Sequence, residues 1–314
     1  MSTEDISRLQ AGNLFGVNGL NVVITGGGSG LGAYMARALA INGASKIFIV
    51  GRREEALTRT KNSLPEQYAK SIIPVLGDVS SKSSLASVRE AITGKHGTNE
   101  IDVLFCNSGI SGPSVATSDP QTKKPYDSVN GLAEAMLAPD EQDITNTYHV
   151  NITGIHLTVA TFLPLLDAAN KARPSPSANV PFKPRPQIIT TSSIGGYNRV
   201  PLGNMSYGPS KAAVVHLTKQ LATVLVPYDI RANTIAPGLY LSEMTEGTMK
   251  AQGKAEKHNV EGTWGKDVIP ATRSGDEEDL TGVVLFLCSR AGAYVNGNVL
   301  VTDGGRLAVM PASY

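Results

Sequence analysis

The feature that most constrains this chain is the alternation of short segments rich in Val and Ile with longer amphipathic segments. The short segments are apolar throughout and occupy residues 21–26, 46–51, 71–77 and 101–106. Such segments are typical of strands that are buried on both faces of a sheet. The amphipathic segments have apolar residues at helical spacing, end near Gly or Pro and occupy residues 31–44, 54–65 and 81–97. Repeated strand–helix units predict a parallel sheet with helices on both faces.

The second half of the chain continues this pattern. Long helices are predicted over residues 141–170 and 207–226. Further strands are predicted at residues 187–192, 230–237 and 297–305. The chain is therefore predicted to form a single α/β domain, a Rossmann-type, doubly wound parallel sheet of seven strands.

Two segments interrupt this rhythm and are interpreted as insertions. Residues 111–139 follow the fourth strand, whereas the Pro-rich residues 171–186 precede the fifth. Ligands of open α/β sheets bind beyond the carboxyl ends of the strands. We therefore expect the first insertion to border the ligand site and the second to project from the opposite edge.

Composition excludes several classes of protein. The 314 residues include 28 Lys and Arg against 27 Asp and Glu, so no positive field favours nucleic acid. The two cysteines, Cys106 and Cys288, lack the density of a disulfide scaffold and the spacing of metal ligands, which favours a reducing compartment. Because we find neither a signal peptide nor a segment able to span a bilayer, we expect a cytoplasmic protein without membrane contact.

A glycine-rich turn follows the first predicted strand and leads into a helix. It contains Gly26, Gly28, Ser29, Gly30, Leu31 and Gly32. Glycines let the backbone approach a pyrophosphate, and the helix N-terminus then holds its negative charge. The motif alone also fits a flexible connection, but its place after the first strand favours dinucleotide binding.

The end of the second predicted strand bears on the choice of cofactor. A carboxylate there would accept hydrogen bonds from the adenosine ribose, but this chain has Gly51 followed by Arg52 and Arg53. A guanidinium suits a 2′-phosphate, so NADP(H) is favoured over NAD(H). The alternative is that both arginines are solvated charges at a helix start.

A Tyr and a Lys lie on one face of the helix predicted from residue 207. Tyr207 and Lys211 are four residues apart, and hydroxyl side chains at 190–193 end the preceding strand. A nearby ammonium and an oxidised nicotinamide would both lower the pKa of the Tyr207 phenol, which could then exchange a proton with a substrate oxygen. A Tyr-x-x-x-Lys pair by itself also fits an ordinary surface pair.

In these ordered motifs the chain resembles the short-chain dehydrogenase/reductase family from about Leu20 to Arg306. The resemblance implies a catalytic domain over 20–306, between an extension, 1–19, and a tail, 307–314. It implies a catalytic tetrad of Asn151, Ser193, Tyr207 and Lys211. The implied cofactor contacts are Thr25, Gly26, Gly30 and Gly32 in the turn, Asp78 and Val79 at the adenine, Asn107, Ser108 and Gly109 after the fourth strand, Tyr207 and Lys211, and Pro237, Gly238 and Ser242 at the nicotinamide.

The family assigns proton transfer to Tyr, a polarising hydrogen bond to Ser, a ribose contact and the lowering of the Tyr pKa to Lys, and a bound water to Asn. Cys106, Ser108 and Ser242 replace the family's usual Asn, Ala and Thr. The interval of fourteen residues between Ser193 and Tyr207 is slightly long, so Ser192 stays a lesser candidate for the catalytic hydroxyl. The resemblance also implies a substrate lid, here at 239–268, and a homodimer or homotetramer whose tail, 307–314, could reach a neighbouring subunit.

These observations predict a ketoreductase that moves hydride from NADPH to a carbonyl substrate, with a general likeness to reductases of polyketide and other secondary metabolism. No metal is expected, because the five histidines show no ligand spacing. One alternative is an alcohol or sugar dehydrogenase that uses the same residues. Another is a protein that binds NADP(H) as a sensor, or templates a cyclisation, without net hydride transfer.

Overall fold

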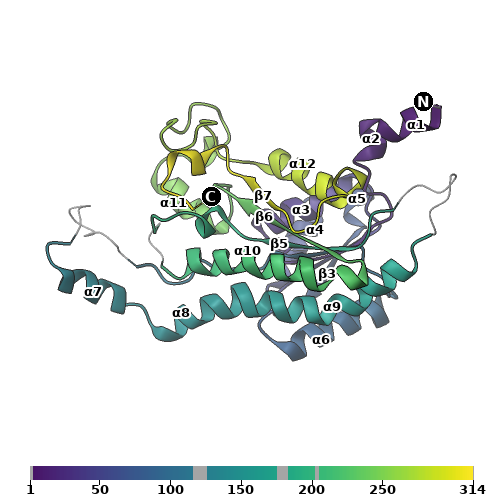
Figure 1. Ribbon diagram of the computed structural model, residues 1–314, viewed down its shortest axis with the longest axis horizontal. Helices are drawn as coiled ribbons and strands as arrows, with labels where there is room; N and C mark the ends of the chain where they lie inside the picture. Colours follow the sequence, from purple (N-terminus) through teal and green to yellow (C-terminus); the bar gives the residue numbers. More distant parts are fainter. Residues whose placement is uncertain (1–2, 116–125, 175–182, 202–204, 314) are drawn as a thin grey trace.

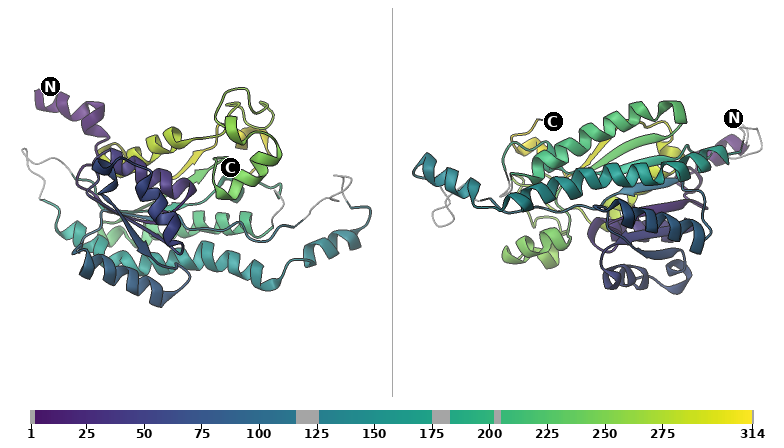
Figure 2. Two further views of the ribbon diagram at one scale, coloured as in Figure 1. Left: turned by 180° about the vertical axis from the view of Figure 1, so that it is seen from behind. Right: turned by 90° about the horizontal axis from the view of Figure 1, so that it is seen from below.

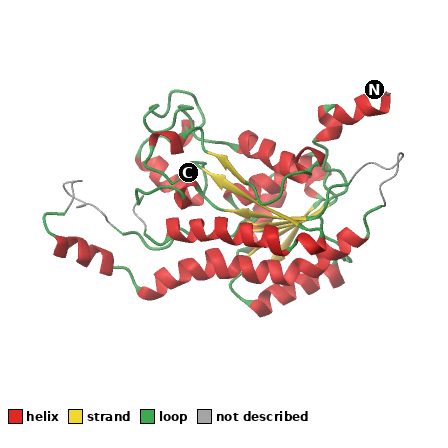
Figure 3. Ribbon diagram, in the orientation of Figure 1, coloured by secondary structure: helices red, strands yellow, loops and turns green. Residues whose placement is uncertain are grey.

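The computed structural model describes residues 3–115, 126–174, 183–201 and 205–313, so parts of both insertions, 116–125 and 175–182, lie outside the described residues. The described residues contain a parallel sheet of seven strands in the order β3-β2-β1-β4-β5-β6-β7. Figure 3 shows the strands in yellow among the red helices. The strands are β1 Asn21–Thr25, β2 Lys46–Gly51, β3 Ile72–Leu76, β4 Val103–Cys106, β5 Gln187–Thr191, β6 Arg231–Pro237 and β7 Val299–Thr302. The predicted doubly wound fold is confirmed, although β4 begins two residues later than expected.

The apolar strands are buried on both faces because each face of the sheet carries a helical layer. Along β1, Val22 and Ile24 belong to one core cluster and Val23 to the other, as the two-residue period of a strand requires. Figures 1 and 2 show the two layers. One contains α3 Gly30–Ile41, α4 Glu54–Asn62 and α12 Glu277–Cys288, and the other contains α6 Lys82–Glu90, α9 Gly154–Lys171 and α10 Tyr207–Val224.

Six further helices are described besides those of the two layers. They are α1 Thr3–Leu9, α2 Ala11–Leu14, α5 Glu66–Ala69, α7 Val129–Leu137, α8 Glu141–Tyr148 and α11 Glu243–Ala251. In Figure 2, α7 extends away from the body of the domain. Within the Pro-rich insertion, Lys183 forms an ion pair of 2.6 Å with Asp102, which precedes β4. The described end of this insertion therefore lies at the amino edge of the sheet, as predicted.

The long helix predicted over 141–170 consists of α8, a π-helical turn at His149–Thr153 and α9. The combined helix Glu141–Lys171 has a window of mean hydropathy 1.4, so it is long and apolar enough to cross a membrane by length and composition. The expectation that no segment meets this criterion is therefore wrong. In the structure 44% of that window is buried, and the helix packs against the sheet and α6, as a core helix does.

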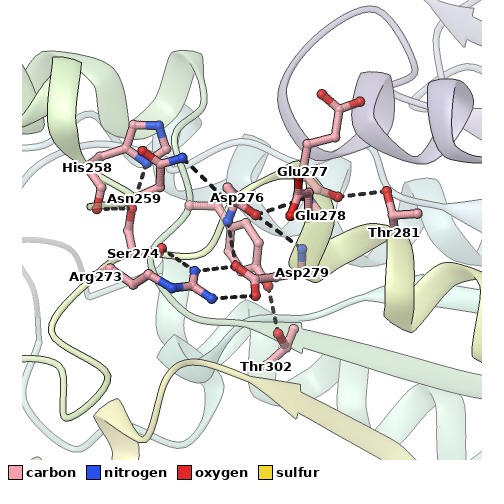
Figure 4. Close-up of polar contacts among 11 residues, drawn as sticks. His258, Asn259, Arg273, Ser274, Asp276, Glu277, Glu278, Asp279, Thr281 and Thr302 are labelled. Carbon is pink, nitrogen blue, oxygen red and sulfur yellow. Dashed lines mark hydrogen bonds and ion pairs between the residues drawn. The ribbon is translucent and has the colours of Figure 1, made fainter. Parts of the chain in front are cut away.

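The segment after β6 forms the predicted excursion but closes later than residue 268. It ends where the Gly275 N–H donates to the Leu239 carbonyl at 2.9 Å. The excursion has a small core of its own around Met249, Trp264 and Ile269. Figure 4 shows how its end is fastened to α12 by the paired hydrogen bonds between Arg273 and Asp279, of 2.5 and 2.8 Å.

The C-terminal tail lies against its own subunit. The Arg199 N–H donates to the Pro311 carbonyl at 2.9 Å, and the Ser313 N–H donates to the Tyr197 carbonyl at 2.8 Å. The expectation that this tail reaches a neighbouring subunit stays a prediction, and the backbone groups of its described residues pair with residues 197–199. This pairing places the tail beside the loop that follows β5.

Candidate active site

A cleft runs along the carboxyl ends of the strands, where the doubly wound topology predicts a ligand site. Its walls come from the glycine turn, the tip of β2, the ends of β4, β5 and β6, and the starts of α10 and α11. The predicted residues that line it are Gly26, Gly28, Ser29, Gly30, Leu31, Arg52, Arg53, Asp78, Val79, Asn107, Ser108, Gly109, Ser193, Tyr207, Lys211, Pro237, Gly238 and Ser242. Thr25, Gly32 and Asn151 do not line the cleft.

The glycine turn forms a backbone cradle at one wall. Gly26 and Gly30 have φ values of 69° and 50°, in the left-handed region that favours glycine. A Cβ at Gly32 would lie 2.1 Å from the Gly26 carbonyl oxygen, so no side chain fits there. The turn opens at the N-terminus of α3, where backbone amides attract an anion. The residues present therefore fit the pyrophosphate of a dinucleotide.

Thr25 and Asn107 hold the strand ends that shape the cleft. The Thr25 hydroxyl donates to the Phe105 carbonyl at 3.2 Å and accepts from the Asn107 N–H at 3.0 Å. The Asn107 amide donates to the Thr25 carbonyl at 3.2 Å and accepts from the Thr191 hydroxyl at 3.1 Å. Thr25 thus ties β1 to β4 behind the turn, and Asn107 extends the link to β5.

Ser193 and Tyr207 meet at the other end of the cleft. The Ser193 side chain hydrogen-bonds the Tyr207 hydroxyl, although fourteen residues separate them in the sequence. The turn after Ser193 packs closely on α10, since a Cβ at Gly196 would lie 2.8 Å from the Lys211 carbonyl carbon. Ser192 instead donates to the Lys211 carbonyl at 2.7 Å. The structure therefore brings Ser193, and not Ser192, to Tyr207.

Lys211 lies under the same end of the cleft and is 4% exposed. Its ammonium donates to the Thr191 carbonyl at 2.8 Å and lies 5.7 Å from the centre of the Tyr207 ring. Burial lowers the pKa of Lys211 to about 8. Burial also raises the pKa of Tyr207 above its usual value, against the smaller lowering effect of the Ser193 hydrogen bond. The protein's own groups therefore raise this pKa, and the lowering expected from Lys211 is not found.

Asn151 lies in the π-helical turn and is fully buried. Its amide donates to the Ile110 carbonyl at 3.0 Å and to the Ser210 hydroxyl at 2.9 Å, and its oxygen accepts from the Ile110 N–H at 2.9 Å. A Cβ at Gly109 would lie 3.2 Å from both the Asn151 oxygen and the Lys211 ammonium. All four residues of the predicted tetrad therefore gather at one end of the cleft.

The opposite end of the cleft is open and charged. Gly51 ends β2, and Arg52 follows it on the surface. Burial raises the pKa of Asp78, but two hydrogen bonds from Ser80 and the charges of Arg52 and His149 outweigh burial and hold the value low. A carboxylate and a guanidinium thus face each other where the adenosine is expected.

Sequence reasoning missed one charged residue of this end. Glu243, the first residue of α11, accepts a hydrogen bond of 2.6 Å from Arg53 and lies 3.7 Å from Arg59. The hydrogen bond from Arg53 holds the pKa of Glu243 below its usual value. The sequence offers no signal for this contact, because 190 residues separate Glu243 from Arg53.

Within the described ranges, no group of three or more His, Cys, Asp or Glu side chains is arranged to hold a metal ion. The groups that line the described cleft are hydroxyls, an ammonium, guanidiniums and the carboxylates of Asp78 and Glu243.

Comparison with known proteins agrees with this geometry. The family model for short chain dehydrogenases matches residues 20–253. The short-chain dehydrogenase/reductase PhomF of Diaporthe leptostromiformis is 42% identical over 316 residues that span the whole of both chains. The rhamnolipids biosynthesis 3-oxoacyl-[acyl-carrier-protein] reductase of Pseudomonas aeruginosa is 30% identical and covers 93% of this chain and 97% of its own.

Among solved structures, the Pseudomonas aeruginosa RhlG/NADP active-site complex superimposes with a TM-score of 0.72 at 27% identity, over 93% of this chain and 98% of that chain. The chain belongs to the short-chain dehydrogenase/reductase family and is an oxidoreductase of that family. Members of this family bind a nicotinamide cofactor and act on small molecules.

Proposed function

We propose that this protein is an NADP(H)-dependent ketoreductase. One observation carries the proposal: a single cleft joins the exposed Arg52 at one end to the hydrogen-bonded Ser193 and Tyr207 at the other. The guanidinium end suits a 2′-phosphate, and the hydroxyl end suits a carbonyl oxygen. The likeness to a 3-oxoacyl reductase and to an NADP complex supports both assignments.

Different parts of the cleft would hold different parts of the cofactor. The glycine turn and the N-terminus of α3 would hold the pyrophosphate, Arg52 the 2′-phosphate, and Pro237, Gly238 and Ser242 the nicotinamide. When bound, the reduced nicotinamide supplies the hydride for the carbonyl carbon. Lys211, whose ammonium lies within the cleft wall, would contact the nicotinamide ribose.

The proton transfer is assigned to Tyr207. Because burial raises its pKa, Tyr207 is a protonated phenol at neutral pH and can donate its proton to the substrate oxygen. Ser193 would donate a second hydrogen bond to that oxygen and polarise the carbonyl. In the oxidative direction the same groups act in reverse, and the positive charge of an oxidised nicotinamide favours the phenolate.

The substrate proposed is a bulky or cyclic ketone, as in secondary metabolism. The support is the named activity of the bacterial relative and two described parts of the chain near the Tyr207 end: a Cβ at Gly112 would lie 2.9 Å from the Ser206 hydroxyl oxygen, and Tyr240 and Met244 line the cleft. We also propose a homo-oligomer that acts in the cytoplasm, consistent with two free, buried cysteines.

The test is NADPH and NADH oxidation against a panel of cyclic ketones and 3-oxoacyl thioesters. We expect Tyr207→Phe to lower kcat by about 10²- to 10⁴-fold while the Kd for NADPH changes by no more than about twofold. Tyr228→Phe is the matched control, because Tyr228 is exposed and lies outside the residues that line the cleft. Equal turnover by Tyr207→Phe would disprove the proton-transfer role. Tight NADPH binding without any turnover of the panel would favour a non-redox role.

A further inference from the structure

The N-terminal end of α11 is attached to the cofactor half of the cleft by several contacts. Tyr34 of α3 donates to the Leu241 carbonyl at 3.2 Å, and a Cβ at Gly30 would lie 3.0 Å from the Ser242 Cβ. Glu243 adds the only charged contacts described between α11 and this half of the chain, to Arg53 and Arg59. The start of the segment 239–275, where a substrate lid is expected, therefore contacts the glycine turn directly.

Glu243 has two hydrogen-bond donors that could also donate to a cofactor phosphate. One is Ser29, the N-terminal cap residue of α3 in the glycine turn, whose side chain hydrogen-bonds the Glu243 carboxylate. The other is Arg53, which donates to the same carboxylate at 2.6 Å. A phosphate bound between the turn and the β2 tip would need these same two donors.

A carboxylate is a chemical mimic of a phosphate at such a site. Both are anionic, accept several hydrogen bonds and pair with the planar guanidinium. Glu243 is also in the first turn of α11, where the helix dipole favours an anion, and the capping interactions of Ser242 with Thr245 fix that turn. The Glu243 side chain is therefore held in place to occupy the phosphate donors.

We propose that Glu243 is a specificity-determining residue that competes with the 2′-phosphate of NADP(H) for Ser29 and Arg53. This inference rests on the proposed NADP(H) function. A phosphate that takes these two donors displaces the carboxylate, so the start of α11 loses its charged contacts with this half of the chain and keeps those with Tyr34 and Gly30. Loading of the cofactor is in this way coupled to the position of the segment that borders the substrate.

The competition should be modest in size, because Arg53 and Glu243 are 61% and 48% exposed. Ion pairs with this exposure change an equilibrium by factors of about 1.5 to 5. An effect of this size is measurable with a ligand that lacks the nicotinamide, so that the Tyr207 end of the cleft makes no contribution.

The experiment measures the Kd of adenosine 2′,5′-bisphosphate and of 5′-AMP by titration calorimetry. For Glu243→Gln we expect about threefold tighter binding of the bisphosphate and little change for 5′-AMP, because only the bisphosphate carries the 2′-phosphate. Glu246→Gln is the matched control. Glu246 lies on the same helix and pairs with Lys250 instead of an arginine of the cleft, so its substitution should leave both affinities unchanged.

Arg53→Gln separates competition from a general effect of charge. It should weaken binding of the bisphosphate, and adding Glu243→Gln to it should give a smaller gain in affinity than in the unmodified protein, since one of the two shared donors is gone. If Glu243→Gln raises the affinity for 5′-AMP as much as for the bisphosphate, or raises it equally with and without Arg53→Gln, the carboxylate only repels anions and the proposal is overturned. Weaker binding by Glu243→Gln would show that the carboxylate orients Arg53 for the phosphate instead of competing with it, which also overturns the proposal.

Failure of the proposed function has a different signature. If the unmodified protein binds 5′-AMP as tightly as the bisphosphate, the proposed NADP(H) preference is wrong. If it prefers the bisphosphate and Glu243→Gln binds no more tightly, the preference stands and the competition is wrong.

Discussion

The two ends of the cleft are built by different physical means. At the Tyr207 end, Lys211 and Asn151 are buried and bonded to backbone groups of other elements. At the adenosine end, Arg52, Arg53 and Glu243 are exposed, and charge pairs are the main contacts that Arg53 and Glu243 make. Because its contacts are buried, the Tyr207 end should respond little to salt and lose much stability on substitution. The exposed charges of the adenosine end should respond to salt, and their substitution should change stability little.

After the loss of the Tyr207 hydroxyl, the largest expected effect comes from the loss of the Ser193 hydroxyl. Ser193→Ala should lower kcat by about 10²- to 10³-fold, because a hydrogen bond to the reacting oxygen is lost. The Ser193 hydrogen bond also lowers the pKa of Tyr207, so its removal raises that pKa further. Alcohol oxidation requires the phenolate, and its alkaline rise should therefore move to higher pH.

The measurement is the pH profile of kcat in the oxidative direction. Ser192→Ala is the control, since Ser192 bonds the Lys211 carbonyl and not Tyr207. A profile that moves to lower pH in Ser193→Ala, or moves equally in both variants, would contradict this account.

The second prediction concerns stability at the buried end. Asn151→Ala leaves the N–H and carbonyl of Ile110 without their side-chain partners. We expect the free energy of unfolding to fall by about 2–4 kcal/mol in urea titrations. Asn146→Ala, at an exposed position one turn earlier in the helix, should change it by no more than about 0.5 kcal/mol. A loss of activity without loss of stability would assign Asn151 a different role.

The third prediction concerns cofactor affinity at the adenosine end. Arg52→Gln should raise the Kd for NADPH about tenfold and leave the Kd for NADH nearly unchanged, because only NADPH carries a 2′-phosphate. Raising NaCl from about 0.05 to about 0.5 M should reduce this difference, since exposed charges are screened. Lys70→Gln removes an exposed positive charge away from the cleft and serves as the control. Equal losses for both cofactors would refute the Arg52 assignment.

Much of the fold could be predicted because its signals are local. The strand-length apolar runs mark buried strands, and the glycine turn lies where a tight backbone turn is predicted, since a Cβ at Gly32 would lie 2.1 Å from the Gly26 carbonyl oxygen. The sequence left both Ser192 and Ser193 as candidates for the catalytic hydroxyl, because both follow the same strand. Only the packing of the next turn on α10 turns Ser193 toward Tyr207 and Ser192 toward the Lys211 carbonyl.

The strand–helix order, the glycine turn and the positions that gather at the carboxyl edge of the sheet follow from the residues alone. These features depend on periodicity and on residue types close together in the chain. The raised pKa of Tyr207, the return of the tail onto residues 197–199 and the pairing of Glu243 with Arg53 depend instead on how the chain packs. Burial, pKa and long-range ion pairs depend on which distant elements pack together, and local sequence does not encode that information.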